Sequence, residues 1–474
     1  MTTPNNHQAN GNMPNNHEID GPQDHPTHDL TVPYELLYTN LHDDEETEQH
    51  KRHRGQRLQK RSIRYYNHAT TKWGSFLENF SPMWFALVIS SGGLALLFAG
   101  TFPYQAHWQI TIATIQYVLE LVLFFTFRTI LLLKWILYPH VAIRKAMNDP
   151  DELGAYAIPP IALMTIGALT ASQVGLGPWG GYAFTVVAYV LWWIGMIWTF
   201  LTAVVVLTTL FYTGNQSSRT MSPVLFMAPV GLATAATESG FITIYSKHMS
   251  ARMAGPILVV GYFAGGVALF MAIILYTIYF HRLLTAGFSP PAKRPGLVIL
   301  IGPAGQIATA FQMMGQSAAG YNHFAEYKPT ALQPPTYGTF WTAQTAQGLQ
   351  GSGIFFALLI LGFRYLMLCL AIVGVVDVFV KRQAKYSLTW WSLVFPSVTI
   401  TTAWMELASS MDSPAFRGLV RAMTALLYVI YFINWSFTIW GIVDGSLIFG
   451  RTHLQTEMEL MAKAQGQAKK KEDV

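Results

Sequence analysis

Long apolar segments recur along this chain and alternate in chemistry. A helix needs about 20 mainly apolar residues to cross the hydrocarbon core of a bilayer. The odd segments contain proline, small residues and hydroxyls, whereas the even segments are bulkier and more aromatic. We predict ten spans, at residues 81–102, 110–137, 156–174, 181–212, 222–242, 254–280, 296–317, 348–380, 387–409 and 416–446.

The prolines of the odd spans predict where those helices lie. They are Pro82, Pro159, Pro160, Pro229, Pro303 and Pro396. Proline removes a backbone hydrogen bond, and the freed carbonyl is tolerated where protein or a water-filled cavity satisfies it, but poorly against lipid. We therefore predict an all-α membrane protein with ten transmembrane helices arranged as five hairpins. The odd helices would form an inner ring around a central pore, and the even helices an outer ring.

The composition supports a membrane protein and argues against a nucleic-acid-binding protein. Only 12% of the 474 residues are charged, about half the share of a soluble domain. The net charge of +5 comes largely from basic segments that flank the apolar spans, so it does not indicate a nucleic-acid partner. The single cysteine, Cys369, excludes an intrachain disulfide.

Charge and polarity divide the chain into three parts. Residues 1–72 are expected to be a disordered cytoplasmic tail ending in a basic juxtamembrane segment, 73–450 the transporter or channel domain, and 451–474 a mobile cytoplasmic tail. The basic segment either contacts anionic lipid or serves only as a topology signal. With the N-terminus inside, nine basic residues fall in inner loops and three in outer loops, which predicts that both termini are cytoplasmic.

Neutral hydrogen-bonding side chains recur on the odd spans. Hydroxyls, amides and backbone N–H groups can hold an anion without binding it too tightly to release it. The alternative is that these small residues only allow close helix packing, but their recurrence on five alternate helices favours a lined path. The candidate path residues are Ser90, Ser91, Thr165, Thr234, Gln306, Thr309, Ser397 and Thr399.

A few ionisable residues lie within the spans. Such residues are functional candidates because their desolvation is costly. Arg364, near the middle of span eight, either binds a substrate carboxylate or forms a structural ion pair with a nearby acid. Glu406, and with less support Glu238, are candidates for proton coupling because a buried carboxyl group can exchange a proton.

Signatures of catalysis are missing from the sequence. No histidine lies mid-span, no spaced His/Cys/Asp cluster suggests a metal, and no Walker-type glycine loop occurs. We therefore expect no enzymatic activity, no cofactor and no bound metal. A membrane enzyme or an assembly scaffold remains the alternative from another class.

Several short motifs in order resemble one transporter family. They are Phe80-Ser81-Pro82-Met83-Trp84-Phe85, Arg294-Pro295-Gly296, Trp391 to Pro396, and Met411 to Phe416. Together they resemble the tellurite-resistance/dicarboxylate transporter family, which includes fungal malic acid transport proteins, fungal sulfite efflux pumps and plant slow anion channels. The resemblance implies a five-hairpin ring, a homotrimer and a pore within each protomer. It also implies that Phe395 plugs the pore; the alternative is a core aromatic beside a kink.

The resemblance leaves the substrate open. The stretch Gly302 to Gln306 is closer to the sulfite pumps, whereas Arg294-Pro295-Gly296 and Asp412 to Phe416 look more like the malate carriers. We expect transport of small anions, malate-type four-carbon dicarboxylates first and sulfite as the alternative. The expected setting is the plasma membrane, with lipid and the anionic solute as partners.

Overall fold

The computed structural model describes residues 72–100, 102–104, 106–177, 180–213, 221–328 and 340–448. All of these residues belong to one compact unit, 69–474. The two tails predicted at 1–72 and 451–474 lie outside the described residues, apart from Lys72.

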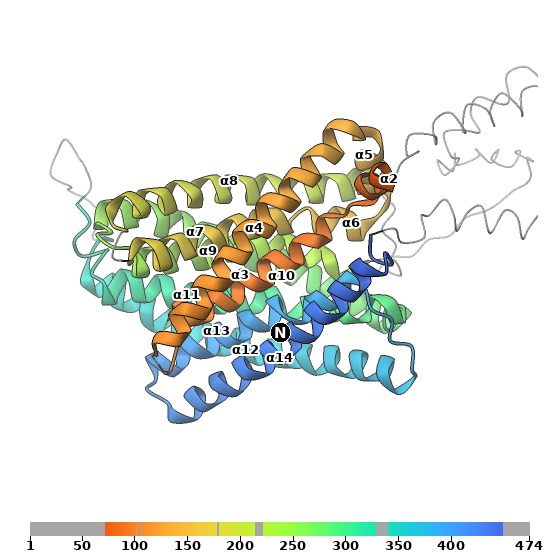
Figure 1. Cartoon of the computed structure of the whole chain (residues 1–474). Helices are drawn as coiled ribbons and strands as arrows, with labels where there is room; N and C mark the ends of the chain where they lie inside the picture. The colour runs from red at the N-terminus through yellow and green to blue at the C-terminus, as the bar shows by residue number, and fades with distance from the viewer. Residues whose placement is uncertain are drawn as a thin grey trace, which may run out of the picture. The chain divides into compact units, whose positions relative to one another are not determined.

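The regular elements of the described ranges are all helical (Figure 1). The long even-numbered spans of the prediction correspond to α4 (His107–Leu137), α8 (Tyr182–Thr213), α10 (Ala251–Ala286), α12 (Ala343–Val380) and α14 (Pro414–Val443). The odd-numbered spans correspond to α3 (Phe85–Ala99), α7 (Ile158–Leu169), α9 (Met227–Tyr245), α11 (Gly302–Gly320) and α13 (Phe395–Ser410). Three short helices are α2 (Lys72–Asn79), α5 (Pro139–Asn148) and α6 (Pro150–Ala155).

Nine segments of the described chain are long and apolar enough to cross a membrane. The remaining predicted span, 387–409, is α13 together with the 3-10 turn Leu388–Leu393 that leads into it. At 16 residues, α13 alone is shorter than a typical membrane span. The helical membrane fold predicted from the apolar pattern is therefore confirmed.

Burial separates the two sets of helices. The most apolar windows of the odd spans that reach membrane length are 83% to 100% buried, and those of the even spans are 28% to 39% buried. Each inner helix packs against the outer helix that follows it in the chain. The inner helices also pack in the closed order α3, α7, α9, α11, α13 and back to α3.

The prolines of the inner helices lie at helix starts rather than in helix middles. Pro82 is in a 3-10 turn that leads into α3, and Pro229, Pro303 and Pro396 lie in the first turns of α9, α11 and α13. Proline is favourable there, because the first N–H groups of a helix have no intrahelical acceptor. Where the prolines suggested a bend within one helix, the structure instead has a 3-10 turn followed by a new α-helix. The proline pattern is also not exclusive to inner helices, because Pro256 lies inside α10.

Glycines allow the backbones of neighbouring helices to approach closely. A Cβ atom at Gly315 of α11 would lie 2.7 Å from Gln350 Cα of α12. A Cβ atom at Gly240 of α9 would lie 2.8 Å from the backbone of Met313 on α11. Small residues serve this purpose in membrane helix pairs, where van der Waals packing replaces the hydrophobic effect.

Candidate functional site in the inner ring

A small cavity lies among the five inner helices. Its volume is about 30 Å³, which is room for about two water molecules. Every inner helix contributes to its wall. The lining residues are Gly93, Leu96, Thr165, Thr237, Glu238, Phe241, Gln306, Thr309, Met313, Phe395, Val398, Thr399, Thr402, Met405 and Glu406.

Four of the eight neutral path candidates line this cavity, namely Thr165, Gln306, Thr309 and Thr399. The other four are not among its lining residues. The Ser91 hydroxyl lies 2.8 Å from the Tyr431 hydroxyl of α14, and Thr234 donates to the Val230 carbonyl within α9. Ser90 is buried and Ser397 half-buried, and neither is among the lining residues.

Polar side chains link neighbouring inner helices across the cavity wall. The Thr237 hydroxyl of α9 donates to the Gln306 carbonyl of α11 at 2.9 Å. The hydroxyls of Thr309 on α11 and Thr402 on α13 lie 3.3 Å apart. Thr237 and Thr402 were not predicted to line the path, although both lie on odd spans. The wall of the cavity thus combines apolar side chains with hydroxyl and amide groups from four inner helices.

The α13 face that lines the cavity extends from Phe395 to Glu406. At about 1.5 Å of rise per residue, this face is about 16 Å long. The Phe395 ring is buried at one end, where a Cβ atom on Gly93 of α3 would lie 3.2 Å from Phe395 Cδ2. Glu406 is buried at the other end. An aromatic ring and a carboxyl group therefore mark opposite ends of one helix face.

Glu238 joins Glu406 in the cavity wall. Both carboxyl groups are buried, and they come from different inner helices, α9 and α13. Glu238 Oε2 makes no hydrogen bond in the structure. A closed cavity with two acids in its wall repels an anion unless those acids hold protons.

Arg364 of α12 reaches from the outer ring to the inner helices. Its side chain is 0% exposed and is not among the lining residues of the cavity. Nη2 donates to the Pro396 carbonyl at 2.7 Å and to the Thr399 hydroxyl at 2.8 Å. The guanidinium lies on Gly305 of α11, at the place where a Cβ atom would stand.

Arg364 has no carboxylate partner among the described residues, since none of their ion pairs includes it. Its Nε and Nη1 atoms also make no hydrogen bond. The structural ion pair considered as one explanation of this residue is therefore not formed. A buried cation of this kind is costly within a membrane, and it lies directly behind a cavity-lining threonine.

Glu120 of α4 makes a comparable contact with its carboxyl group. Its carboxyl group is buried on Gly92 of α3, again where a Cβ atom would stand. Its Oε1 atom accepts a hydrogen bond from Thr165 of α7, which lines the cavity, and its Oε2 atom has no hydrogen-bond partner. This acid was not among the residues predicted for the site.

The site therefore contains ionisable and neutral polar groups but offers no cluster of metal ligands among the described residues. Two threonines in the cavity wall, Thr165 and Thr399, each bond to an ionisable side chain that comes from an outer helix. Groups of this kind can hydrogen-bond to a small polar solute, and the cavity must widen beyond its room for about two water molecules to admit one. Nothing in it resembles the nucleophile and base pair of covalent catalysis.

Comparison with known proteins identifies the family. The family model described as voltage-dependent anion channel (SLAC1) matches residues 79–439. A malic acid transport protein of Schizosaccharomyces pombe is 23% identical over 375 residues, which cover 78% of this chain and 80% of that protein. A sulfite efflux pump of Arthroderma benhamiae is 24% identical over 364 residues, which cover 77% of this chain and 91% of that pump. Because the family model covers most of the chain, this integral membrane protein belongs to the voltage-dependent anion channel family.

Proposed function

We propose that this protein carries small anions across the membrane along a path between its inner helices. The observation that carries the proposal is Arg364, a buried cation that has no carboxylate partner in the described part of the chain and bonds to Thr399 in the cavity wall. The wall around Thr399 also contains the hydroxyl and amide groups of Thr309, Thr402 and Gln306. Neutral donors backed by one positive charge attract an anion while leaving it free to depart.

The substrate class that we propose is a malate-type four-carbon dicarboxylate. A dianion carries twice the negative charge of chloride, so the protein must stabilise it more strongly. The positive charge of Arg364 supplies part of that stabilisation. The relatives named as malic acid transport proteins support this class. Sulfite is the second candidate, and the relatives named as sulfite efflux pumps support it.

We further propose that Phe395 is the gate and that Glu406 and Glu238 make transport depend on protons. Phe395 fills one end of the cavity face of α13. An anion passes Glu238 and Glu406 with least repulsion when both are protonated. Passage of the anion would then be linked to the protonation state of these two acids.

The proposed cellular arrangement follows from charge and resemblance. We place the protein in the plasma membrane with both termini cytoplasmic, because basic residues are concentrated in the loops on the side of the N-terminus. We further propose that the protein assembles as a homotrimer with one path in each protomer. We propose no enzymatic activity for it.

The proposed function is tested by solute flux into proteoliposomes that contain the purified protein. Malate, sulfite, nitrate and chloride are compared at equal concentration, with protein-free liposomes as the control. We expect malate flux above the other three, reduced when the external pH rises. Faster sulfite flux would replace the dicarboxylate assignment, and no flux of any of the four anions would contradict anion transport.

A further inference from the structure

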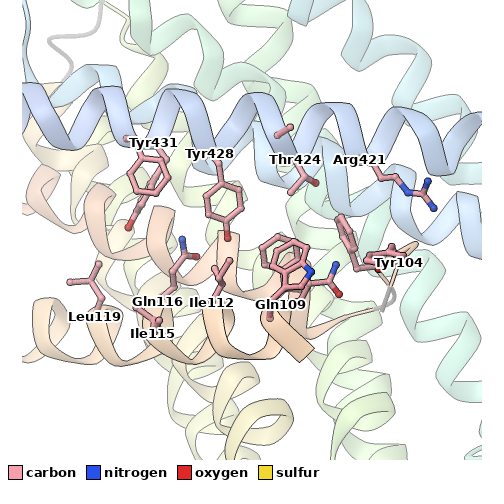
Figure 2. A pocket seen from close by; sticks show the side chains of 15 residues that line it. Tyr104, Gln109, Ile112, Ile115, Gln116, Leu119, Arg421, Thr424, Tyr428 and Tyr431 are labelled. Atoms are coloured by element: carbon pink, nitrogen blue, oxygen red, sulfur yellow. The ribbon is translucent and has the colours of Figure 1, made fainter. Parts of the chain in front are cut away.

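A large crevice lies on the outside of the inner ring, between α4 and α14 (Figure 2). Its volume is about 760 Å³, within the range of about 300–1,000 Å³ that ligand pockets occupy. Phe98, near the end of α3, contributes to its wall, and the Phe98 ring stacks on Tyr428 at a centroid distance of 5.6 Å. The crevice is separate from the central cavity, because α3 lies between them and lines the cavity with Gly93 and Leu96.

The crevice is polar at one end and apolar along the rest of its length. Figure 2 shows Arg421 and Tyr104 at one end, and Leu119 and Tyr431 towards the other. The polar end lies beside the connection between α3 and α4, where Arg421 Nη2 donates to the Pro103 carbonyl at 3.3 Å. That single bond leaves the other N–H groups of an exposed guanidinium available.

One buried polar atom on the crevice wall, Gln109 Nε2, has no hydrogen-bond partner among the described residues. Nearby, the Tyr428 hydroxyl and the Gln116 amide bond to each other. Gln109 is 1% exposed, and its Oε1 accepts the Ala106 backbone N–H at the start of α4, so only its N–H₂ group is unused. Buried polar atoms in an apolar wall are costly unless a bound molecule satisfies them.

We propose that this crevice binds one glycerophospholipid of the leaflet on the side of the α3–α4 connection. The phosphate lies at Arg421, and an ester carbonyl accepts from Gln109 Nε2. One acyl chain follows the wall formed by Ile112, Ile115 and Phe432 towards the membrane centre. Charge complementarity at one end and an apolar channel beyond it fit an amphiphile with an anionic phosphate, held in one orientation.

The test is native mass spectrometry of the full-length protein, purified in mild detergent and supplied with phosphatidylglycerol. Arg421→Ala removes the phosphate ligand, and Ala425→Trp fills the crevice while keeping the arginine, since Ala425 lines it. Arg417→Ala and Ala422→Trp are matched controls on the same helix, because neither residue lines the crevice.

We expect about one tightly held phospholipid per protomer in the wild type and in both controls. Retention should fall about tenfold or more in Arg421→Ala and Ala425→Trp. Equal retention in all five proteins would overturn the proposal. So would a change of oligomeric state in Ala425→Trp without loss of lipid, because that result identifies the crevice as a contact with a second copy of the chain.

Discussion

Replacing Arg364 by methionine removes the buried positive charge and keeps most of the side-chain volume. The Pro396 carbonyl keeps a hydrogen-bond partner, because it also accepts the Thr399 hydroxyl at 2.8 Å, and that hydroxyl keeps its bond as a donor. It also removes the cost of burying an ion, which replacement by an apolar side chain of similar size often relieves. We therefore expect the variant to fold and to reach the membrane in normal amounts.

The size of the effect on anion affinity follows from the geometry. Nη2 lies 2.8 Å from the Thr399 hydroxyl, so an anion in contact with that threonine would lie about 6 Å from the guanidinium. At an effective dielectric constant of about 20, a unit charge at about 6 Å is stabilised by about 3 kcal/mol. Loss of that attraction corresponds to about 100-fold weaker anion binding.

The assay is the concentration dependence of malate flux into proteoliposomes, normalised to the reconstituted protein. Arg128→Met is the matched control, because Arg128 is an arginine of outer helix α4 whose guanidinium lies over the Trp198 ring, away from the cavity. We expect Arg364→Met to raise the half-saturating malate concentration about 100-fold, and Arg128→Met to leave it unchanged.

Arg364→Lys distinguishes a field effect from direct contact with the substrate. Lysine keeps the charge but not the planar two-donor geometry that fits a carboxylate. Because Arg364 does not line the cavity, we expect the lysine variant to retain most of the affinity and the malate-to-chloride ratio. A well-expressed Arg364→Met protein with wild-type affinity would refute the electrostatic role altogether.

Three other variants test the remaining parts of the site. Phe395→Leu should increase anion leak through the closed state, measured as chloride flux without a gradient of malate, and an unchanged leak would assign the ring to packing alone. Glu406→Gln should flatten a malate uptake that otherwise falls as pH rises from about 5 to 8, with the exposed Glu326→Gln as the control; a retained pH profile would make Glu406 structural. Gly305→Ala places a Cβ atom on the Arg364 guanidinium and should weaken malate affinity as Arg364→Met does, with no further loss in the double variant. Additive losses of malate affinity in the double variant would show that Gly305 and Arg364 act independently.

The division into inner and outer helices could be predicted from sequence because the bilayer restricts the alternatives. Lipid cannot satisfy the backbone groups left open where a helix breaks, so the breaks just before Pro303 and Pro396 must be covered by protein. Where each helix begins was harder to predict. The prolines start new α-helices after 3-10 turns, and the sequence does not distinguish such a break from a bend within one helix.

The rotation of each inner helix could not be predicted, because these helices are buried on every side. Ser91 faces Tyr431, whereas Gly93 faces Phe395 and the cavity. Two residues along a helix differ by about 200° in direction, and an apolar pattern around the whole helix gives no cue to which side is inner. Glu120 was missed for a related reason, since only its contacts in the folded protein, with Gly92 and Thr165, show that an outer-helix acid reaches the inner ring.

The glycine contacts connect the proposed gate to the outer ring on both sides. The Phe395 ring rests on Gly93, whose neighbour Gly92 carries the Glu120 carboxyl group from α4. The next residue after the ring, Pro396, has its carbonyl bound by Arg364 from α12. Both side chains come from helices whose most apolar windows are only 28% buried, so the opposite faces of these helices are exposed to the membrane. A shift of α12 would therefore move a charge that bonds to the carbonyl next to Phe395, and a shift of α4 would move the carboxyl group that rests on Gly92, without any change in the residues that line the path.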